Sequence, residues 1–588
     1  MRFALHDLAG LDRIAELPGC EDATPELVDA ILDEAARLSA GVLAPLNRPG
    51  DAEGCKLEDG YKVRTPAGYK DAYRQFIDGG WNGLNFPQQY GGQGLPKLVA
   101  APVMEMVMAA NLGFSLCSLL TGGAVEALLR YGSAQQKQTY LPNMVAGSWT
   151  GTMNLTEPQA GSDLGLIRTR ALPQGGHYRI YGQKIFITHG EHDMADNIIH
   201  LVLARTPDAP EGVKGISLFV VPKFLVNADG SLGRRNDVRC VSIEHKLGIH
   251  GSPTAVLAYG DDDGATGYLV GELHRGLEYM FVMMNEARYA VGLQGVAISG
   301  RAYQHALAYA RERIQGKDLA HPGGQPVSII HHPDVRRMLM SMKALTESTR
   351  ALAYVVGAAL DRAHRDADPA ARDEARAFAD FMMPIHKGWA TEAGIEVANL
   401  GIQVHGGMGY VEETGAAQYL RDARITTIYE GTTGIQANDL IGRKIAREGG
   451  NTARALAARI RLLADQLSTA PDGGLQAIGR ALNDAVAAFT GCVDWIVANF
   501  RSDTLAVHAG AVPFLKLAGI LCGGWQLARA ALIAQQRLGA GTETSAFLSA
   551  KIATARFYAD TYLAQAAGLR HAVLYSGAAA MALAEQQF

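Results

Sequence analysis

The sequence predicts a mainly helical fold with one inserted antiparallel β domain. Two patterns predict it. Over most of the chain apolar residues recur at helical spacing, and alanine and leucine abound. Between 149 and about 270, β-branched and aromatic residues instead alternate with polar ones, punctuated by Gly and Asp. Because 588 residues are too many for one hydrophobic core, about three or four domains are expected.

Composition narrows the class of protein. The chain is 48% hydrophobic and 19% charged with a net charge of −5, which indicates a soluble globular protein without general attraction to nucleic acid or anionic membranes. The six cysteines form no CxxC pair, so free thiols in a reducing compartment are expected. No metal site is predicted. The N-terminus lacks a signal peptide's apolar run, and charged or amide residues interrupt the apolar region 98–129, which favours buried helices over a membrane span. A cytoplasmic location follows.

The first predicted parts are a lead segment over 1–30 and a helical domain over 31–148. Helical spacing predicts a helix from Thr24 to about Leu46, opened by a Thr-Pro helix-start signal. A polar, turn-rich stretch follows, then a helix over about 66–78 and a glycine loop that ends at Gly94. Two or three helices are expected between 98 and 144, closed by Pro142.

The predicted β domain covers 149–272. Tyr178 to Thr188 is expected to form a hairpin with Gly182 near its turn. Two further strands are expected over 198–204 and 216–221.

The predicted helical bundle covers 273–446, and a C-terminal extension covers 447–588. Periodicity predicts long helices over 288–314, 334–365 and 373–404, the last ended by the glycines after His405. Residues 447–451 are expected to form a linker. About four alanine-rich helices are expected after it.

One carboxylate is the leading catalytic candidate. Glu430 lies between Tyr429 and Gly431, after apolar and hydroxyl side chains that would solvate its ionised form poorly. A carboxylate held this way can have a raised pKa and serve as a general base near neutral pH. Gly431 and Gly434 let the backbone approach a flat or anionic group. The alternative is that Glu430 caps the helix that runs through Gln436.

Three further clusters are candidates for ligand binding. The loop 153–163 could surround a heterocycle or phosphate with hydroxyls and backbone N–H groups, or be a plain turn. Phe186 and Thr188 are expected on one face of a strand, where a ring and a hydroxyl suit a flat redox ring; a half-buried strand face is the alternative. Arg313 offers a planar donor fork for a pyrophosphate, and the glycines of 403–409 permit close backbone approach. Alone, a residue such as Arg313 is more often a solvated helix residue.

Together and in this order, the clusters resemble the acyl-CoA dehydrogenase family. Leu155-Thr-Glu-Pro-Gln-Ala-Gly-Ser-Asp163 is similar to the family's first signature, and Gln403-x-x-Gly-Gly-x-Gly409 through Asp422 to its second. Ile428-Tyr-Glu-Gly-Thr432 resembles the catalytic-base segment. The agreement spans about residues 70 to 445. The length and the extension resemble a subgroup that includes 3-methylmercaptopropionyl-CoA dehydrogenases.

The resemblance implies a helical domain, a β domain and a helical bundle, with FAD between the last two and extra C-terminal helices. Glu430 would be the catalytic base. FAD would be bound by Leu155, Thr156, Gly161, Ser162, Phe186, Thr188, Arg313, Gln403, Gly406, Gly407 and Thr432. Substrate would be contacted by Ser162, Asn285, Arg288 and Gly431. Because Arg313 and the Gln403 loop would grip the FAD of a neighbouring subunit, at least a homodimer, or a homotetramer, is implied.

The implied reaction forms a trans-2-enoyl-CoA. Glu430 would remove the α-proton of an acyl-CoA, a hydride would pass from the β-carbon to flavin N5, and electron-transferring flavoprotein would reoxidise the FAD. The substrate is left open between 3-methylmercaptopropionyl-CoA and a medium- or long-chain fatty acyl-CoA, as in β-oxidation. Alternatives on the same fold are a flavin oxidase and a DNA-binding relative. The latter is disfavoured because acids are interspersed among the Arg and Lys residues of 452–588.

Four positions depart from the family's pattern. Asn154 stands where a small residue is usual, Gln418 where Lys or Arg is usual, and Asn285 where Asp is common. Phe186 matches a position that is often Trp. None of them is the base.

Overall fold

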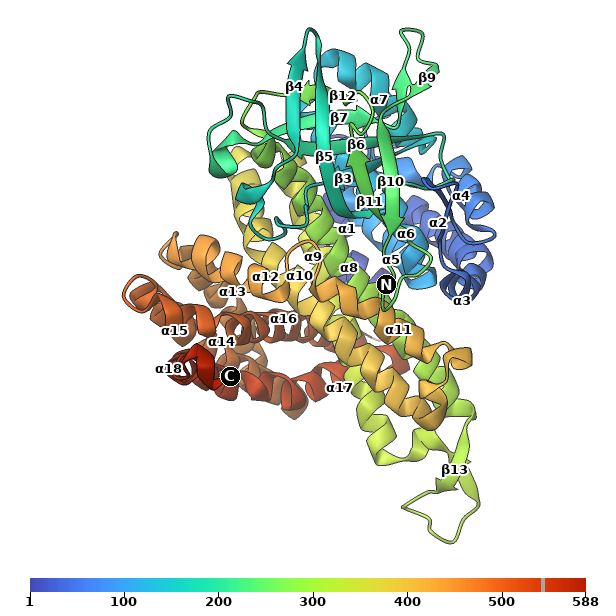
Figure 1. Cartoon of the computed structure of the whole chain (residues 1–588). Helices are drawn as coiled ribbons and strands as arrows, with labels where there is room; N and C mark the ends of the chain where they lie inside the picture. The colour runs from blue at the N-terminus through green and yellow to red at the C-terminus, as the bar shows by residue number, and fades with distance from the viewer. Residues whose placement is uncertain (541–544) are drawn as a thin grey trace. The chain divides into compact units, whose positions relative to one another are not determined.

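The computed structural model describes residues 1–540 and 545–588. The chain divides into two units (Figure 1). Unit 1 comprises Met1–Ala30, Pro96–Glu105 and Val291–Phe588, and unit 2 comprises Ile31–Leu95 and Met106–Ala290. The chain passes from one unit to the other within helices α2, α5 and α8, and once more between Leu95 and Pro96, just before α5.

The helices between residues 25 and 146 follow the predicted pattern with two differences. The first helix ends at Leu38, where a wide turn over Ser39–Leu43 replaces regular helix. Pro142 does not close the last helix but lies inside it, and Gly147 at φ +84° ends it. In unit 2, Tyr69, Tyr73 and Phe76 pack around Phe114 as the centre of an aromatic core. The bounds are α2 Pro25–Leu38, α3 Ala44–Glu53, α4 Tyr69–Asp78, α5 Lys97–Ala110, α6 Leu112–Tyr131 and α7 Ala134–Ala146. The stretch expected to be turns contains the antiparallel pair β1 Lys56–Glu58 and β2 Lys62–Arg64.

A twisted sheet forms the rest of unit 2, with α6 packed against β3. Its strand order is β10-β11-β5-β12-β7-β6-β3, and β4 pairs with β5. The strands are β3 Trp149–Asn154, β4 Arg170–Gln174, β5 His177–Thr188, β6 Asn197–Ala204, β7 Ser217–Pro222, β10 Val238–Ile243, β11 Thr254–Tyr259 and β12 Ala265–Val270. A separate pair is β8 Phe224–Val226 and β9 Leu232–Arg235.

Two details of the sheet differ from the prediction. The expected hairpin is wrong: residues 177–188 form one strand, β5, and Gly182 lies inside it at φ +147°. A Cβ at Gly182 would lie 2.6 Å from Thr169 Oγ1, so this glycine permits close backbone approach rather than a turn. The pairing is antiparallel except between β3 and β6, which run parallel. Because more than forty residues separate these strands, the chain has room for the crossover that a parallel pair needs.

Long helices dominate unit 1. The helix expected over 288–314 is longer at its start and ends before Arg313, because α8 covers Gly276–Glu312. The helix after His332-Pro333 agrees with the prediction. The bounds are α1 Leu11–Ala15, α9 Pro333–Arg365, α10 Pro369–His405, α11 Ala416–Ala423 and α12 Thr433–Asp439. A short hairpin, β13 Ile314–Lys317 with β14 Pro326–Ser328, lies between α8 and α9.

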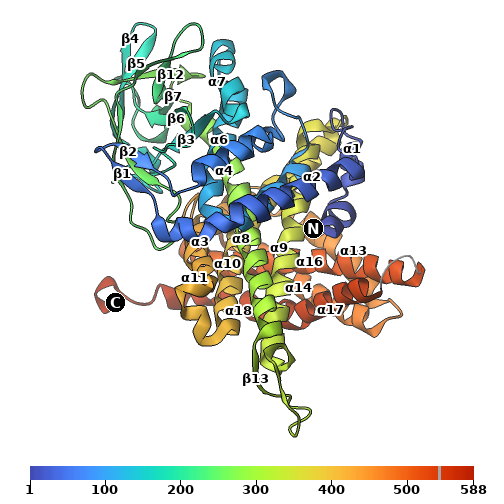
Figure 2. The same cartoon turned by 90° about the vertical axis from the view of Figure 1, so that its right-hand side faces the viewer.

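The C-terminal extension is helical, as expected, but the described residues hold six helices rather than about four. They are α13 Asn451–Ser468, α14 Gly473–Asn499, α15 Thr504–Ala509, α16 Ala511–Ala540, α17 Ser545–Thr561 and α18 Ala566–Ala580. Helices α13, α14, α16 and α17 lie side by side in Figure 2. Phe489 and Phe514 stack at 5.4 Å between α14 and α16.

Three helices, α6, α14 and α16, are long and apolar enough to cross a membrane by length and composition alone. Their most apolar windows are 72%, 44% and 83% buried within the protein, respectively. The apolar residues of α6 and α16 are therefore largely used for internal packing.

The contact between α16 and α10 gives a stability prediction. A Cβ at Gly519 of α16 would lie 2.2 Å from Cγ of the buried Trp389 on α10. Gly519→Ala should therefore lower the free energy of unfolding by about 1–3 kcal/mol, as overpacked cores do. Gly539→Ala is the matched control on the same helix, because a Cβ there would meet no described heavy atom within 4 Å. In chemical denaturation Gly539→Ala should leave the free energy of unfolding unchanged or raise it by up to about 1 kcal/mol. Equal stability of the two variants would contradict the prediction.

Candidate active site

In unit 2, the loop that follows β3 is held by a buried ion pair. Lys184 of β5, which is fully buried, donates to Glu157 Oε1 at 2.8 Å and to the Leu155 carbonyl at 2.9 Å. Glu157 also accepts from the Thr169 hydroxyl at 2.6 Å and from the Arg168 N–H at 2.6 Å. Burial raises the pKa of Glu157, but Lys184 and these hydrogen bonds outweigh it and lower that pKa to about 2. Burial lowers the pKa of Lys184 to about 8, so both groups are charged at neutral pH.

This ion pair fixes the loop residues that were predicted to bind a cofactor. Leu155 is buried and Thr156 is half-buried, whereas Gly161 and Ser162 are exposed. The Ile185 N–H of β5 donates to the Thr156 carbonyl at 2.9 Å, so loop and strand are joined beside Phe186. Sequence reasoning missed the roles of Glu157 and Lys184, although both lie in the motifs. The only signal in the sequence for this ion pair is Lys184 itself, a lysine on an otherwise apolar face of the predicted strand.

Phe186 is presented by a β-bulge. Ile185 and Phe186 together oppose one residue of β11, because Lys184 pairs with Leu257 and Ile187 with Ala255. Phe186 has φ +59° and is 59% exposed. The alternation used to place Phe186 and Thr188 on one face therefore does not apply across the bulge. Phe186 nevertheless exposes its ring from a strained backbone two residues before the half-buried Thr188, and an exposed ring can serve as a platform for a flat ligand.

Two predicted substrate residues of unit 2, Asn285 and Arg288, lie on α8. Asn285 is exposed, and Arg288 is buried at 6% exposure. They are three residues apart and so neighbour one another on the helix surface.

Asn154, a departure from the family pattern, faces the sheet interior. Its amide donates to Thr152 Oγ1 at 2.8 Å and accepts from the Tyr259 hydroxyl at 2.9 Å. This substitution thus alters the sheet core rather than the loop surface.

In unit 1, Glu430 lies in a strained turn and not in a helix cap. Its φ is +54°, and Gly431 follows at +87°; a non-glycine residue in this region costs about 1–3 kcal/mol. The N-cap of α12 is Thr432, whose hydroxyl accepts from the Ile435 N–H at 3.2 Å. Glu430 is therefore not the cap. Its neighbour Tyr429 donates its hydroxyl to Gln294 Oε1 of α8 at 2.5 Å.

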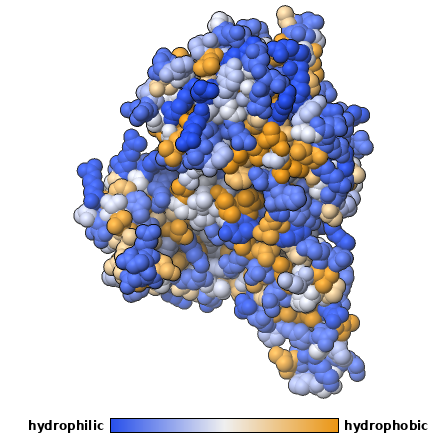
Figure 3. All heavy atoms as spheres, in the orientation of Figure 1, coloured by the Kyte–Doolittle hydropathy of each residue, from blue (hydrophilic) through white to orange (hydrophobic). Residues whose placement is uncertain are grey.

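The other predicted residues of unit 1 are exposed. Arg313 follows the end of α8, and Gln403 lies in the last turn of α10. Gly406, at φ +60°, and Gly407 are also exposed, and a Cβ on either would meet no described heavy atom within 4 Å. Exposed hydrophobic side chains lie in the same two segments: Ile314, Leu319, Met408, Tyr410 and Val411. The part of unit 1 that carries the hairpin β13–β14, here called the β13 arm, shows hydrophobic residues in Figure 3. Gln418 is buried and donates to Asp422 at 3.2 Å, so it still provides a donor where Lys or Arg is usual.

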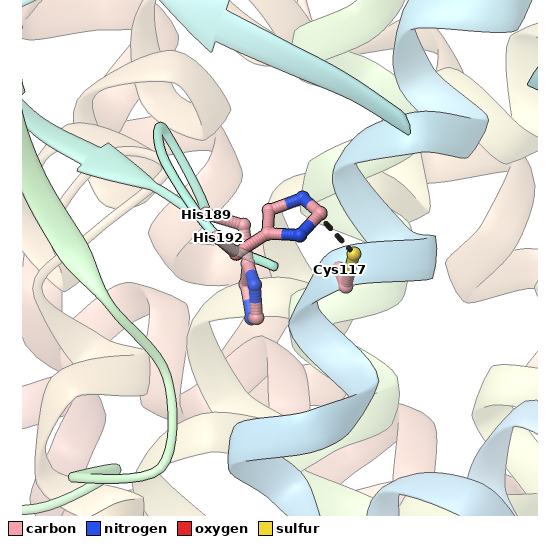
Figure 4. A group of neighbouring side chains, drawn as sticks. All are labelled: Cys117, His189 and His192. Atoms are coloured by element: carbon pink, nitrogen blue, oxygen red, sulfur yellow. Dashed lines mark hydrogen bonds between the residues drawn. The ribbon is translucent and has the colours of Figure 1, made fainter. Parts of the chain in front are cut away.

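A buried Cys–His cluster of unit 2 includes His189, which directly follows Thr188 in the sequence. Figure 4 shows Cys117 on α6 with His189 and His192, whose ligand atoms lie within 4.8 Å of one another. The Met194 N–H donates to His192 Nδ1, so the proton of neutral His192 is on Nε2, which faces Thr150 Oγ1 at 3.0 Å. Burial lowers the pKa of His189 to about 4 and raises that of the Cys117 thiol. Cys117 Sγ lies 4.0 Å from His192 Nε2, so the described side chains form a buried hydrogen-bonded network between α6 and the segment that follows β5.

Comparisons with known proteins identify the family and the fold. Family models match at residues 29–148 (acyl-CoA dehydrogenase, N-terminal domain), 152–261 (middle domain), 274–445 (C-terminal domain) and 454–584 (acetyl-CoA dehydrogenase C-terminal like). A 3-methylmercaptopropionyl-CoA dehydrogenase of Ruegeria pomeroyi is 52% identical over 96% of this chain and 95% of its own length. A butyryl-CoA dehydrogenase of Syntrophomonas wolfei is 36% identical over 99% and 96%. The fold matches the crystal structure of an acyl-CoA dehydrogenase complexed with FAD from Bacillus anthracis, with TM-score 0.76, 21% identity, and 96% and 90% coverage.

Proposed function

This chain belongs to the acyl-CoA dehydrogenase family, and we propose that Glu430 is its catalytic base and 3-methylmercaptopropionyl-CoA its substrate. The predictions of fold class, family, FAD cofactor and FAD-dependent acyl-CoA dehydrogenase activity are confirmed. The site residues and the acyl group are our proposal. The observation that carries the substrate is the 52% identity that extends over nearly the whole of both chains.

The residues present fit a flavin. In unit 2, the bulge exposes the Phe186 ring, Thr188 follows two residues later, and the Thr156 carbonyl accepts from the Ile185 N–H at 2.9 Å. Adjoining segments thus offer an apolar ring and two hydroxyl side chains to a flat group. We propose that Leu155, Gly161 and Ser162 bind the same group. When bound, FAD accepts the hydride that leaves the β-carbon. Thr432, Arg313, Gln403, Gly406 and Gly407 are proposed as FAD contacts from unit 1, some of them toward a neighbouring subunit.

Glu430 would hold and move the proton. Its carboxylate takes the α-proton of the thioester, and the main-chain N–H of Glu430 donates to the thioester oxygen, where negative charge develops. Asn285, Arg288, Ser162 and Gly431 are proposed to bind the substrate. Loss of the α-proton and of the β-hydride leaves a trans α,β-unsaturated thioester.

The electron acceptor, the assembly and the location are proposed from the family resemblance. We propose electron-transferring flavoprotein as electron acceptor, a homodimer or homotetramer as the assembly, and a cytoplasmic location. The exposed apolar residues of the β13 arm support assembly, because large exposed apolar patches mark interaction surfaces. If the acyl group is instead a straight fatty chain, as the butyryl-CoA relative suggests, the role would be in β-oxidation.

An anaerobic titration tests the substrate. The visible flavin band of the purified protein is recorded while 3-methylmercaptopropionyl-CoA, butyryl-CoA and longer acyl-CoAs are added. The 3-methylmercaptopropionyl thioester should bleach the flavin fastest, because one methylene or sulfur in a matched pocket is worth about 10- to 200-fold in specificity. Faster bleaching by a straight-chain acyl-CoA would contradict the substrate, and no bleaching by any acyl-CoA would contradict the dehydrogenase.

A further inference from the structure

The turn that carries Glu430 is fixed by two buried side chains from different helices. Lys387 of α10 is fully buried, and its Nζ donates to the Gly431 carbonyl at 2.6 Å. Gln436 of α12 is also fully buried, and its Nε2 donates to the Glu430 carbonyl at 3.1 Å and to the Gly431 carbonyl at 3.3 Å. Both donors lie in unit 1 with the base.

These bonds act on the conformation that the base needs. A left-handed φ at Glu430 persists only where the surroundings over-determine it. Donors on the carbonyls of Glu430 and Gly431 fix the two peptide planes that follow the base, and so restrain the turn from which the Glu430 side chain projects. Gly431 cannot be replaced without disturbing the same contact, because a Cβ there would lie 2.7 Å from Gln436 Nε2.

The C-terminal extension packs directly behind these donors. Gly388, the residue after Lys387, is covered by Leu515 of α16: a Cβ at Gly388 would lie 2.5 Å from Leu515 Cδ2 and 3.4 Å from Gln436 Cβ. The next residue, Trp389, fills the space left by Gly519 and Gly523 on α16. Helix α16 therefore leaves Lys387 and Gln436 little room to move.

The position of Lys387 is unusual for a lysine, because its side chain is fully buried. A fully buried lysine is costly to desolvate, and full burial of lysine is rare without a specific partner. Lys387 donates to the Gly431 carbonyl in the turn that carries the base. A misplacement of about 1 Å in a reacting group can lower a rate about 100-fold, so a donor that holds this turn acts on the rate.

We propose that Lys387 and Gln436 are positioning residues that hold the Glu430–Gly431 turn, with helix α16 of the extension packed behind them. This rests on the proposed role of Glu430 as the base. The extension is thereby part of the apparatus that orients the base.

The test compares Lys387→Met and Gln436→Met with the wild type. Each removes the donors while keeping an unbranched side chain of similar length. Stopped-flow flavin bleaching by acyl-CoA should slow about 10- to 100-fold, while the flavin spectrum, the Tm and the Kd of a non-reacting acyl-CoA analogue stay near wild type. The α-deuterium isotope effect on bleaching should rise, because proton removal becomes slower than the steps around it.

The matched control is Gln526→Met. Gln526 is as buried as Gln436, but it lies on α16 and its Oε1 accepts from Arg529 of its own helix at 2.7 Å. Its bleaching rate should stay within about threefold of wild type. The inference is overturned if both test variants bleach at the control's rate, or if their loss appears only as lost FAD or a lowered Tm. Glu430→Gln, measured in parallel, separates the two ideas: full activity in that variant would overturn the base itself.

Discussion

Replacing Glu430 with glutamine should leave a folded, yellow protein whose flavin is reduced by acyl-CoA at least about 100-fold more slowly. The amide has nearly the same shape as the carboxylate but cannot accept the α-proton. Because Thr432 caps α12, the change removes no helix cap. FAD content and Tm should therefore stay near wild type. Single-turnover bleaching under anaerobic conditions measures the effect without interference from the electron acceptor.

Glu392→Gln is the matched control for this change. Glu392 is an exposed carboxylate of α10 that accepts from the Thr433 hydroxyl at 2.6 Å, next to the same turn. Its variant should bleach within about threefold of wild type. Equal losses in the two variants would show a general effect of charge near the turn. More than about a tenth of wild-type rate in Glu430→Gln would remove Glu430 from the role of base.

The largest expected effect on stability comes from Lys184. Lys184→Met leaves the Glu157 carboxylate buried without its cation, and breaking a buried ion pair by removing one partner costs about 3–5 kcal/mol. The loop 155–163 should loosen with it, so FAD should dissociate more readily. Urea denaturation of the apoprotein and FAD titration measure the two effects.

Two comparisons make this prediction specific. Lys62→Met removes an exposed pair with Asp59, whose side chains are 59% and 69% exposed, and should cost at most about 1 kcal/mol. Adding Glu157→Gln to Lys184→Met removes the uncompensated charge but keeps an acceptor for Thr169, so part of the stability should return. Stability of Lys184→Met equal to that of Lys62→Met would contradict the account.

The sequence was sufficient for the family, the fold class and the cofactor. Helices such as α9 were predictable because a proline opens them and their apolar residues repeat over many turns. The motif around Glu430 was recognisable because short polar motifs keep their spacing, but the positive φ of Glu430 was not, since only neighbouring donors make such a conformation stable.

The errors share a physical cause. Glycine favours turns, so the sequence of 178–188 predicts a turn near Gly182, yet in β5 this glycine allows the close approach of Thr169. The bulge at Phe186 depends on the register against β11, which the sequence of β5 alone does not contain. Lys387 contacts the base turn only after α10 packs against α12. Each of these features is set by tertiary contacts rather than by local pattern.

The most direct test of the central claim is the deuterium isotope effect on anaerobic flavin bleaching in the wild-type protein. The acyl-CoA substrate is labelled with deuterium at the α-carbon in one sample and at the β-carbon in another. If Glu430 removes the α-proton while the β-hydride leaves, both labels should slow bleaching by a primary isotope effect. Bleaching of Glu430→Gln should be at least about 100-fold slower than that of the wild type. Full bleaching with no effect of the α-label would contradict a base-catalysed dehydrogenation.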